Sequence, residues 1–133
     1  MALLKEIIQW CDQTLKSHEF KDYAPNGLQI EGKSEVKKIL CAVTASQDAI
    51  EATIEQNADL LLVHHGYFWK GEPYPITGMR GKRIKSLIQN DISLAGYHLP
   101  LDAHPILGNN AAIADILDLE NIEALDPNER HPI

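Results

Sequence analysis

The chain has 133 residues and a formal net charge of -7, with a sequence pI of about 5.2. This length suits one domain with a substantial core, and the acidic charge argues against broad binding to a nucleic acid backbone. Its apolar runs are shorter than the ~18 residues of a membrane span, and the first residues lack the long apolar core of a signal peptide. We therefore expect one cytoplasmic domain over residues 1–133 that binds neither nucleic acid nor membrane.

Helical and strand patterns alternate in the first half of the chain. Apolar residues at helical spacing predict an amphipathic helix over 3–16, and a turn with Pro and Asn-Gly follows at 23–27. Residues 37–44 look like a buried strand. Ser46 is expected to cap a helix that ends near Asn57.

The same alternation continues in the second half. Patterns predict a strand over 59–63, a helix over 82–90 and a strand over 93–97. Asn109 or Asn110 is expected to cap a last helix. Strands that alternate with helices through short joints predict an α/β fold, with a mixed, mostly parallel sheet flanked by helices.

The chain has two cysteines, Cys11 and Cys41, in apolar surroundings and without a CxxC pair. We expect both to be small buried residues in a reducing compartment, and neither a disulfide nor a zinc knuckle.

Histidines and a carboxylate follow two of the predicted strands. His64 and His65 close the apolar run that starts at Leu60, and the segment after 93–97 carries His98 and Asp102. Because the carboxyl ends of parallel strands share one edge of a sheet, these side chains are expected to converge there. Adjacent histidines in a regular strand point to opposite faces, so we expect the backbone to turn past the strand end, where the pair can serve one ion or two neighbouring ions.

Imidazole and carboxylate ligands suit zinc, iron, manganese or nickel. A metal at this edge would lower the pKa of a bound water, so metal-assisted hydrolysis is the expected reaction class. The competing interpretation is that these are ordinary surface or hydrogen-bonding histidines, which is how we interpret His18 and His131. The sequence has no HExxH signature, which disfavours a zincin protease.

Aromatic residues crowd the loop over 66–74, directly after the histidine pair. Trp69 is expected to stack on a planar base of the substrate, with Lys70 near a phosphate. The alternatives are a loop anchored by its own aromatic rings and a subunit interface. The basic residues of segment 80–85 form either an anion site or, as we favour, a solvated helix face.

At these residues the sequence resembles the GTP cyclohydrolase 1 type 2 homologues, also called Nif-three-like proteins, and it matches the amino-terminal half of that family. The motifs that carry the resemblance are Asn26-Gly27-Leu28, Val63-His64-His65-Gly66 with Tyr67-Phe68-Trp69-Lys70-Gly71, His98-Leu99-Pro100-Leu101-Asp102-Ala103-His104-Pro105, and Gly108-Asn109-Asn110.

The resemblance implies an α/β fold with a dinuclear site for up to two divalent ions, and a ring-shaped homohexamer. It makes His64, His65 and Asp102 metal ligands and His98 the neighbouring catalytic group, with His104 a weaker candidate. It further implies a metal-dependent hydrolase that acts on a nucleotide-like substrate, with GTP ring opening as the reaction named for the family.

The chain departs from the family in one respect. Family members are usually longer, and a later His and Glu complete their metal site; Glu129 and His131 do not match that motif. Two interpretations follow: either the chain is the front part of a longer family fold, or another chain supplies the rest of the site.

Three other functions compete with the hydrolase. The first is a non-catalytic metal-binding regulatory or scaffold protein that forms a ring-shaped oligomer. The second is a metallophosphoesterase, which is disfavoured because Gly108-Asn109-Asn110 lacks the histidine of a GNH motif. The third is an interaction module that uses the exposed aromatic residues.

Overall fold

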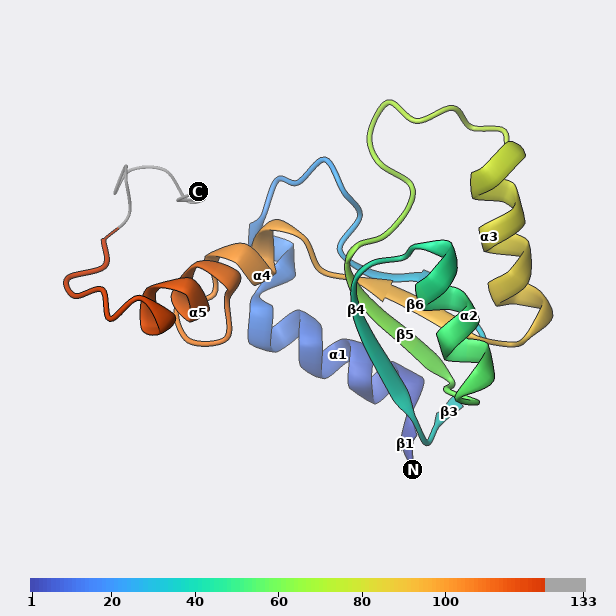
Figure 1. Ribbon diagram of the computed structural model, residues 1–133, viewed down its shortest axis with the longest axis horizontal. Helices are drawn as coiled ribbons and strands as arrows, with labels where there is room; N and C mark the ends of the chain where they lie inside the picture. The colour runs from blue at the N-terminus through green and yellow to red at the C-terminus, as the bar shows by residue number, and fades with distance from the viewer. Residues whose placement is uncertain (124–133) are drawn as a thin grey trace.

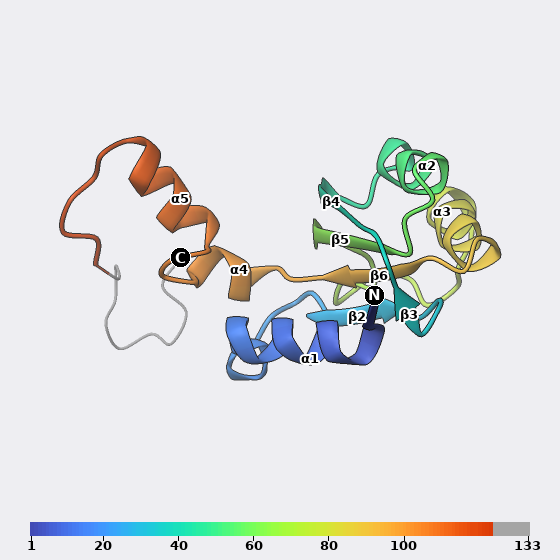
Figure 2. The ribbon, with the colours of Figure 1, turned by 90° about the horizontal axis from the view of Figure 1, so that it is seen from below.

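One mixed four-stranded sheet with helices on both faces forms the body of the protein (Figures 1 and 2). The structure is a computed structural model, and it describes residues 1–123. In spatial order the strands are β2 (Gly27–Ile30), β6 (Ser93–Gly96), β5 (Leu60–His65) and β4 (Ile39–Thr44). β4, β5 and β6 are parallel to one another and β2 is antiparallel to β6, which confirms the predicted mixed, mostly parallel sheet.

Three helices cover the two faces of this sheet. α2 (Gln47–Glu55) and α3 (Gly78–Gln89) lie on one face, and α1 (Leu4–Leu15) lies on the other (Figure 2). The hydroxyl of Ser46 accepts a hydrogen bond from the backbone N–H of Ala49 at 3.1 Å, so the predicted cap of α2 is confirmed. No helix within residues 1–123 is long and apolar enough to cross a bilayer.

The alternation of side chains along β5 divides the core into two layers. Leu61 and Val63 belong to the cluster under α2 and α3, whereas Leu60 belongs to the cluster under α1. Leu60 and Leu61 are both fully buried. A strand whose two faces are both covered needs a continuous apolar run, which explains the sequence Leu60-Leu61-Leu62-Val63.

Several elements do not follow from the sequence patterns. β2 begins at Gly27, the last residue of the predicted turn, and extends over residues for which no element was predicted; a two-stranded ribbon joins β1 (Ala2–Leu3) to β3 (Glu35–Val36). η1 (Ser17–Glu19) and α4 (Leu99–Ala103) were not predicted either, whereas α5 (Asn109–Ile116) is the predicted last helix. The cap residue of α5 is Gly108, so the prediction of Asn109 or Asn110 at that position is wrong.

β4 was predicted as a buried strand, and this is wrong for its side chains. It is the edge strand of the sheet, and α1 leaves its outer face uncovered: Val43 is 70% exposed and Ile39 is 42% exposed. For the same reason Cys41 is exposed, while Cys11 on α1 is buried as expected.

Candidate metal centre

Three imidazoles gather at the carboxyl end of the parallel strands. One ring nitrogen from each of His64, His65 and His98 lies within 4.8 Å of the others. The ring centroids are 4.3 Å apart for the adjacent pair, and His98 lies 5.0 Å from His64 and 5.7 Å from His65. The predicted meeting of the two strand ends therefore exists in the structure.

The histidine pair occupies a different position in the backbone from the one expected. His64 and His65 are the last two residues of β5, and the chain turns at Gly66 only after them. The neighbouring strand β6 pairs with β5 only as far as Gly96, opposite Val63. Both histidines thus lie beyond the end of β6, where the loop that carries His98 crosses the edge of the sheet.

In all three histidines the Nδ1 atom has a hydrogen-bonding neighbour. His64 Nδ1 donates to the carbonyl of Tyr97 at 2.9 Å, and His98 Nδ1 lies 3.0 Å from a carboxylate oxygen of Asp22. His65 Nδ1 lies 3.2 Å from the hydroxyl of Thr44, the last residue of β4. Nε2 is therefore the ring nitrogen that is left to bind an ion. Histidines that bind metals are commonly oriented by a hydrogen bond at the ring nitrogen that does not contact the metal. The donor set therefore fits a divalent ion.

Asp22 is a site residue that the sequence patterns missed. Its side chain is 2% exposed, and besides His98 it accepts hydrogen bonds from the side chain of Asn26 and from the backbone N–H of Ala24 and of Leu99. Burial acts to raise the pKa of Asp22, but the hydrogen bonds from His98 and these other donors outweigh it and hold the pKa below its usual value. Asp22 is therefore a buried anion that orients the His98 ring.

Asp102, on α4, lies beside His64. Its Oδ1 is 3.6 Å from His64 Nε2 and accepts a hydrogen bond from the Asn109 side chain at 2.8 Å. The helix begins directly after His98, whose carbonyl accepts the backbone N–H of Leu101 and of Asp102. The role of Asp102 as a metal ligand stays a prediction, supported by its place next to His64.

Burial affects the charge of the cluster. It lowers the pKa of His65, and the nearby His64 and His98 lower it further, while Asp102 partly offsets them. A lower pKa favours the neutral imidazole, the form that binds metals.

The other histidines have different surroundings. His104 Nδ1 accepts the backbone N–H of Ile106 and of Leu107, so it stabilises the turn after α4. His18 has a side chain that is 76% exposed. Glu129 and His131 lie outside the described residues.

The aromatic loop after β5 lies against the imidazoles. The Trp69 ring is 5.0 Å from His98 and 6.0 Å from His65, and its Nε1 donates to the carbonyl of Gly66 at 3.2 Å. Lys70 has an exposed side chain, and its backbone N–H donates to the carbonyl of Tyr23. The substrate roles of Trp69 and Lys70 stay predictions.

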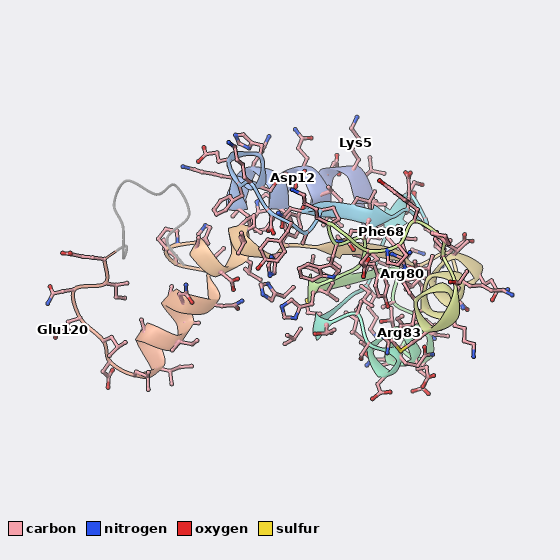
Figure 3. All side chains as sticks on the ribbon, turned by 90° about the horizontal axis from the view of Figure 1, so that it is seen from above. Lys5, Asp12, Phe68, Arg80, Arg83 and Glu120 are labelled. Atoms are coloured by element: carbon pink, nitrogen blue, oxygen red, sulfur yellow. The ribbon has the colours of Figure 1, made fainter. Side chains whose placement is uncertain are left out.

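Arg80, in the basic segment of α3, binds this loop. Its guanidinium pairs with Glu72 at 2.8 Å, donates to the carbonyls of Pro73 and Pro75, and lies 6.0 Å from the Phe68 ring (Figure 3). Arg80 therefore fastens the aromatic loop to α3.

An apolar groove of about 470 Å³ has His64 in its lining. It runs between α1 and the uncovered face of β4, with Trp10, Val43 and Leu107 in its walls. The cluster is thus in contact with the aromatic loop through Trp69 and borders the apolar groove through His64.

Comparisons with known sequences give one family. The sequence profile of Duf34/NIF3 (NGG1p interacting factor 3) matches residues 2–131. The chain is 61% identical over 121 residues to a "GTP cyclohydrolase 1 type 2 homolog" of Haemophilus influenzae, which covers 91% of this chain and 48% of that protein. A protein with the same name from Escherichia coli K12 is 51% identical over 122 residues, 92% of this chain and 49% of its own length. The chain spans about half the length of these curated relatives.

Solved structures show the same fold. A structure described as "Structural genomics, protein ybgI, unknown function" superposes with a TM-score of 0.92 at 49% identity, over 95% of this chain and 51% of the other. Reduced HcgD from Methanocaldococcus jannaschii superposes with a TM-score of 0.83 at 30% identity, over 96% of this chain and 51% of that protein.

Proposed function

The chain belongs to the Duf34/NIF3 family, and from this we propose that it is the metal-binding half of a metal-dependent hydrolase that acts on a nucleotide-like substrate. The observation that carries the proposal is the cluster of His64, His65 and His98, whose ring nitrogens lie within 4.8 Å of one another. The name of the curated relatives, "GTP cyclohydrolase 1 type 2 homolog", supports a nucleotide as the first substrate to test.

His64, His65 and Asp102 are the proposed ligands, and His98 is the proposed catalytic group beside them. A divalent ion held there would act as a Lewis acid toward a carbonyl or phosphoryl oxygen of the substrate. The contact between Asp22 and His98 Nδ1 fixes the proton of this ring on Nδ1 and leaves Nε2 as a proton acceptor. His98 is thus suited to take a proton at Nε2 from the attacking group.

The aromatic loop supplies the proposed substrate contacts. Trp69 is already fixed through its indole N–H, so its ring offers a rigid face to a base. Lys70 adjoins it with an exposed amine that suits a phosphate. The remainder of the proposal, a homohexameric ring located in the cytoplasm, follows the family resemblance.

The experiment is a measurement of metal content by mass spectrometry, on protein purified without chelator or metal-affinity resin. We expect about one to two zinc, iron, manganese or nickel ions per chain, loss of these ions in His65→Ala, and retention in the control variant His18→Ala. Hydrolysis of GTP by the loaded protein is then assayed in the same two variants. Equal metal content in His65→Ala and His18→Ala would reject the site.

A non-catalytic metal-binding role in a ring-shaped oligomer is the second candidate. It is favoured by the exposed apolar side chains on α5, where Ile113 is 54% and Ile116 is 78% exposed, because apolar surfaces of this kind are often covered by a partner. This role predicts metal binding without turnover, and a change in oligomer mass, measured by light scattering, when Ile116 is replaced by Ser.

A further inference from the structure

Gln29 reaches from β2 across the sheet to the chain segment that leaves His65. β2 and β6 are out of regular register between Leu28 and Ile30, so Gln29 is the extra residue of a β-bulge. A bulge redirects a side chain that a regular strand would point elsewhere, and bulges recur next to functional sites. The redirected carboxamide accepts the backbone N–H of Tyr67 at 2.8 Å and donates to the carbonyl of Pro25 at 2.9 Å.

Two glycines make room for this side chain. A Cβ atom on Gly66 would lie 2.2 Å from Gln29 Oε1, and a Cβ atom on Gly96 would lie 2.8 Å from Gln29 Nε2. Both distances are below any real non-bonded contact, so an alanine at either position must displace the carboxamide. The glycine directly after the histidine pair thus serves the close approach of Gln29 as well as the turn.

The peptide unit between Gly66 and Tyr67 is held at both ends. Its carbonyl accepts the indole N–H of Trp69, and its N–H donates to Gln29. One peptide unit separates it from His65, whose own carbonyl accepts the backbone N–H of Ala45 at 2.9 Å, so the backbone is held on both sides of Gly66 as it leaves the histidine. On the other side, Thr44 contacts the His65 ring.

We propose that Gln29 is a positioning residue of the histidine cluster: by holding the Gly66–Tyr67 peptide it fixes the His65 ring relative to His64 and His98. The inference rests on the proposed metal-binding function. It predicts that loss of the carboxamide loosens the site without removing any ligand.

The test compares Gln29→Met, which keeps the length of the side chain and removes its polar atoms, with Gln47→Met. Gln47 is a matched control because, within residues 1–123, its side chain bonds only to Glu51 on the same helix. In the metal-free protein, NMR follows hydrogen exchange of the Tyr67 amide and the imidazole nitrogen signals of His65. We expect Gln29→Met to exchange that amide about fivefold faster or more and to shift the His65 signals, while Gln47→Met does neither.

Zinc affinity, measured by competition with a chromogenic chelator, is the second readout. We expect Gln29→Met to bind zinc roughly 10–100-fold more weakly than the wild type. If the wild type binds zinc and Gln29→Met keeps both its affinity and its His65 signals, the inference is wrong while the metal site stands. If the wild type binds no zinc, the proposed function fails, and unchanged His65 signals would overturn the inference as well.

A glycine variant tests the same contact independently. Gly66→Ala should lower the melting temperature in the wild-type background and lower it less in a chain that also carries Gln29→Ala, because the atoms it would collide with are then gone. Equal losses in both backgrounds would show that Gly66 and Gln29 do not act together.

Discussion

Asp22 and His98, 76 positions apart in the chain, meet at 3.0 Å in the interior, and the carboxylate is 2% exposed. An Asp22→Asn substitution keeps the shape of the side chain but replaces one carboxylate oxygen with an NH2 group. This NH2 group cannot accept the hydrogen bonds that the wild-type carboxylate accepts. We expect the free energy of unfolding to fall by about 1–3 kcal/mol and the imidazole nitrogen signals of His98 to shift in NMR, because Nδ1 loses its carboxylate partner. Urea unfolding and NMR measure these effects, with the exposed Asp118→Asn as the control. Unchanged His98 signals in Asp22→Asn would show that the His98 ring does not depend on this contact.

Asp102 provides a contrasting case on α4. Its side chain is 24% exposed, so Asp102→Asn should leave the free energy of unfolding within about 0.5 kcal/mol of the wild type. Because the substitution removes a negative ligand beside His64, metal affinity should fall by at least roughly tenfold. The exposed Asp115→Asn on α5 is the control. Full metal binding by Asp102→Asn would remove Asp102 from the ligand set.

Asp59, which directly precedes β5 at the end of the strand away from the histidines, should make the stability of the protein depend on acidic pH. Its carboxylate accepts the backbone N–H of Lys37 and of Lys38 and pairs with Lys33 at 3.3 Å. The hydrogen bond from Lys37 is the main cause of its lowered pKa; burial opposes it, and Lys38 and Lys33 add to it.

A folded-state pKa below the unfolded value means that Asp59 stabilises the protein above the unfolded pKa of about 3.9. This stabilisation is lost as the pH falls through the folded-state pKa. We expect Asp59→Asn to destabilise the protein by about 1–3 kcal/mol at pH 7, and by less at pH 3. Urea unfolding at the two pH values measures the difference; a difference that does not change with pH would contradict the assignment.

Arg80 should govern the mobility of the aromatic loop. Removing its pair with Glu72 and its bonds to the loop carbonyls by Arg80→Met costs about 1 kcal/mol locally, which raises the opened population about fivefold. Limited proteolysis should therefore cut the loop over 66–77 about fivefold faster. Lys82→Met, on the exposed face of the same helix, should leave the cleavage rate unchanged.

Neighbouring strands should respond differently to the loss of an aliphatic side chain. Leu61 on β5 is fully buried, so Leu61→Ala should lower the free energy of unfolding by about 2–5 kcal/mol. Val43 on β4 is 70% exposed, so Val43→Ala should change it by about 0.5 kcal/mol or less. A large loss in Val43→Ala, measured by urea unfolding, would show that another surface covers β4 in solution.

The sequence patterns predicted an element correctly where its apolar residues form a strong periodic or continuous pattern. Helical spacing gave α1, and the apolar run from Leu60 gave β5 and the place of the histidines at its end. They were insufficient for β2, which is four residues long, begins at a glycine and contains the bulge at Gln29. The exposure of β4 also escaped them, because its apolar residues look the same whether or not a helix covers them.

In the candidate site, too, some residues could be predicted from the sequence and one could not. His64, His65, His98 and Asp102 could be brought together by the rule that parallel strands end at one edge. Asp22 could not, because a carboxylate in a polar turn gives no sign of being buried. Its partner is fixed only by the fold of the segment that ends at Asn26, whose side chain accepts the backbone N–H of His98.

The long separations within the cluster have a consequence for folding. His64 bonds to Tyr97 across 33 positions, and Asp22 bonds to His98 across 76. Closing loops of this length costs conformational entropy, and the chain loses this entropy before the contacts can stabilise it. An unfolded chain therefore presents no assembled ion site. An ion that binds only the finished sheet adds RT ln(1 + [L]/Kd) to its stability, about 2.7 kcal/mol when free ion is 100 times Kd. Metal supply would then set how much of this protein persists in the folded state.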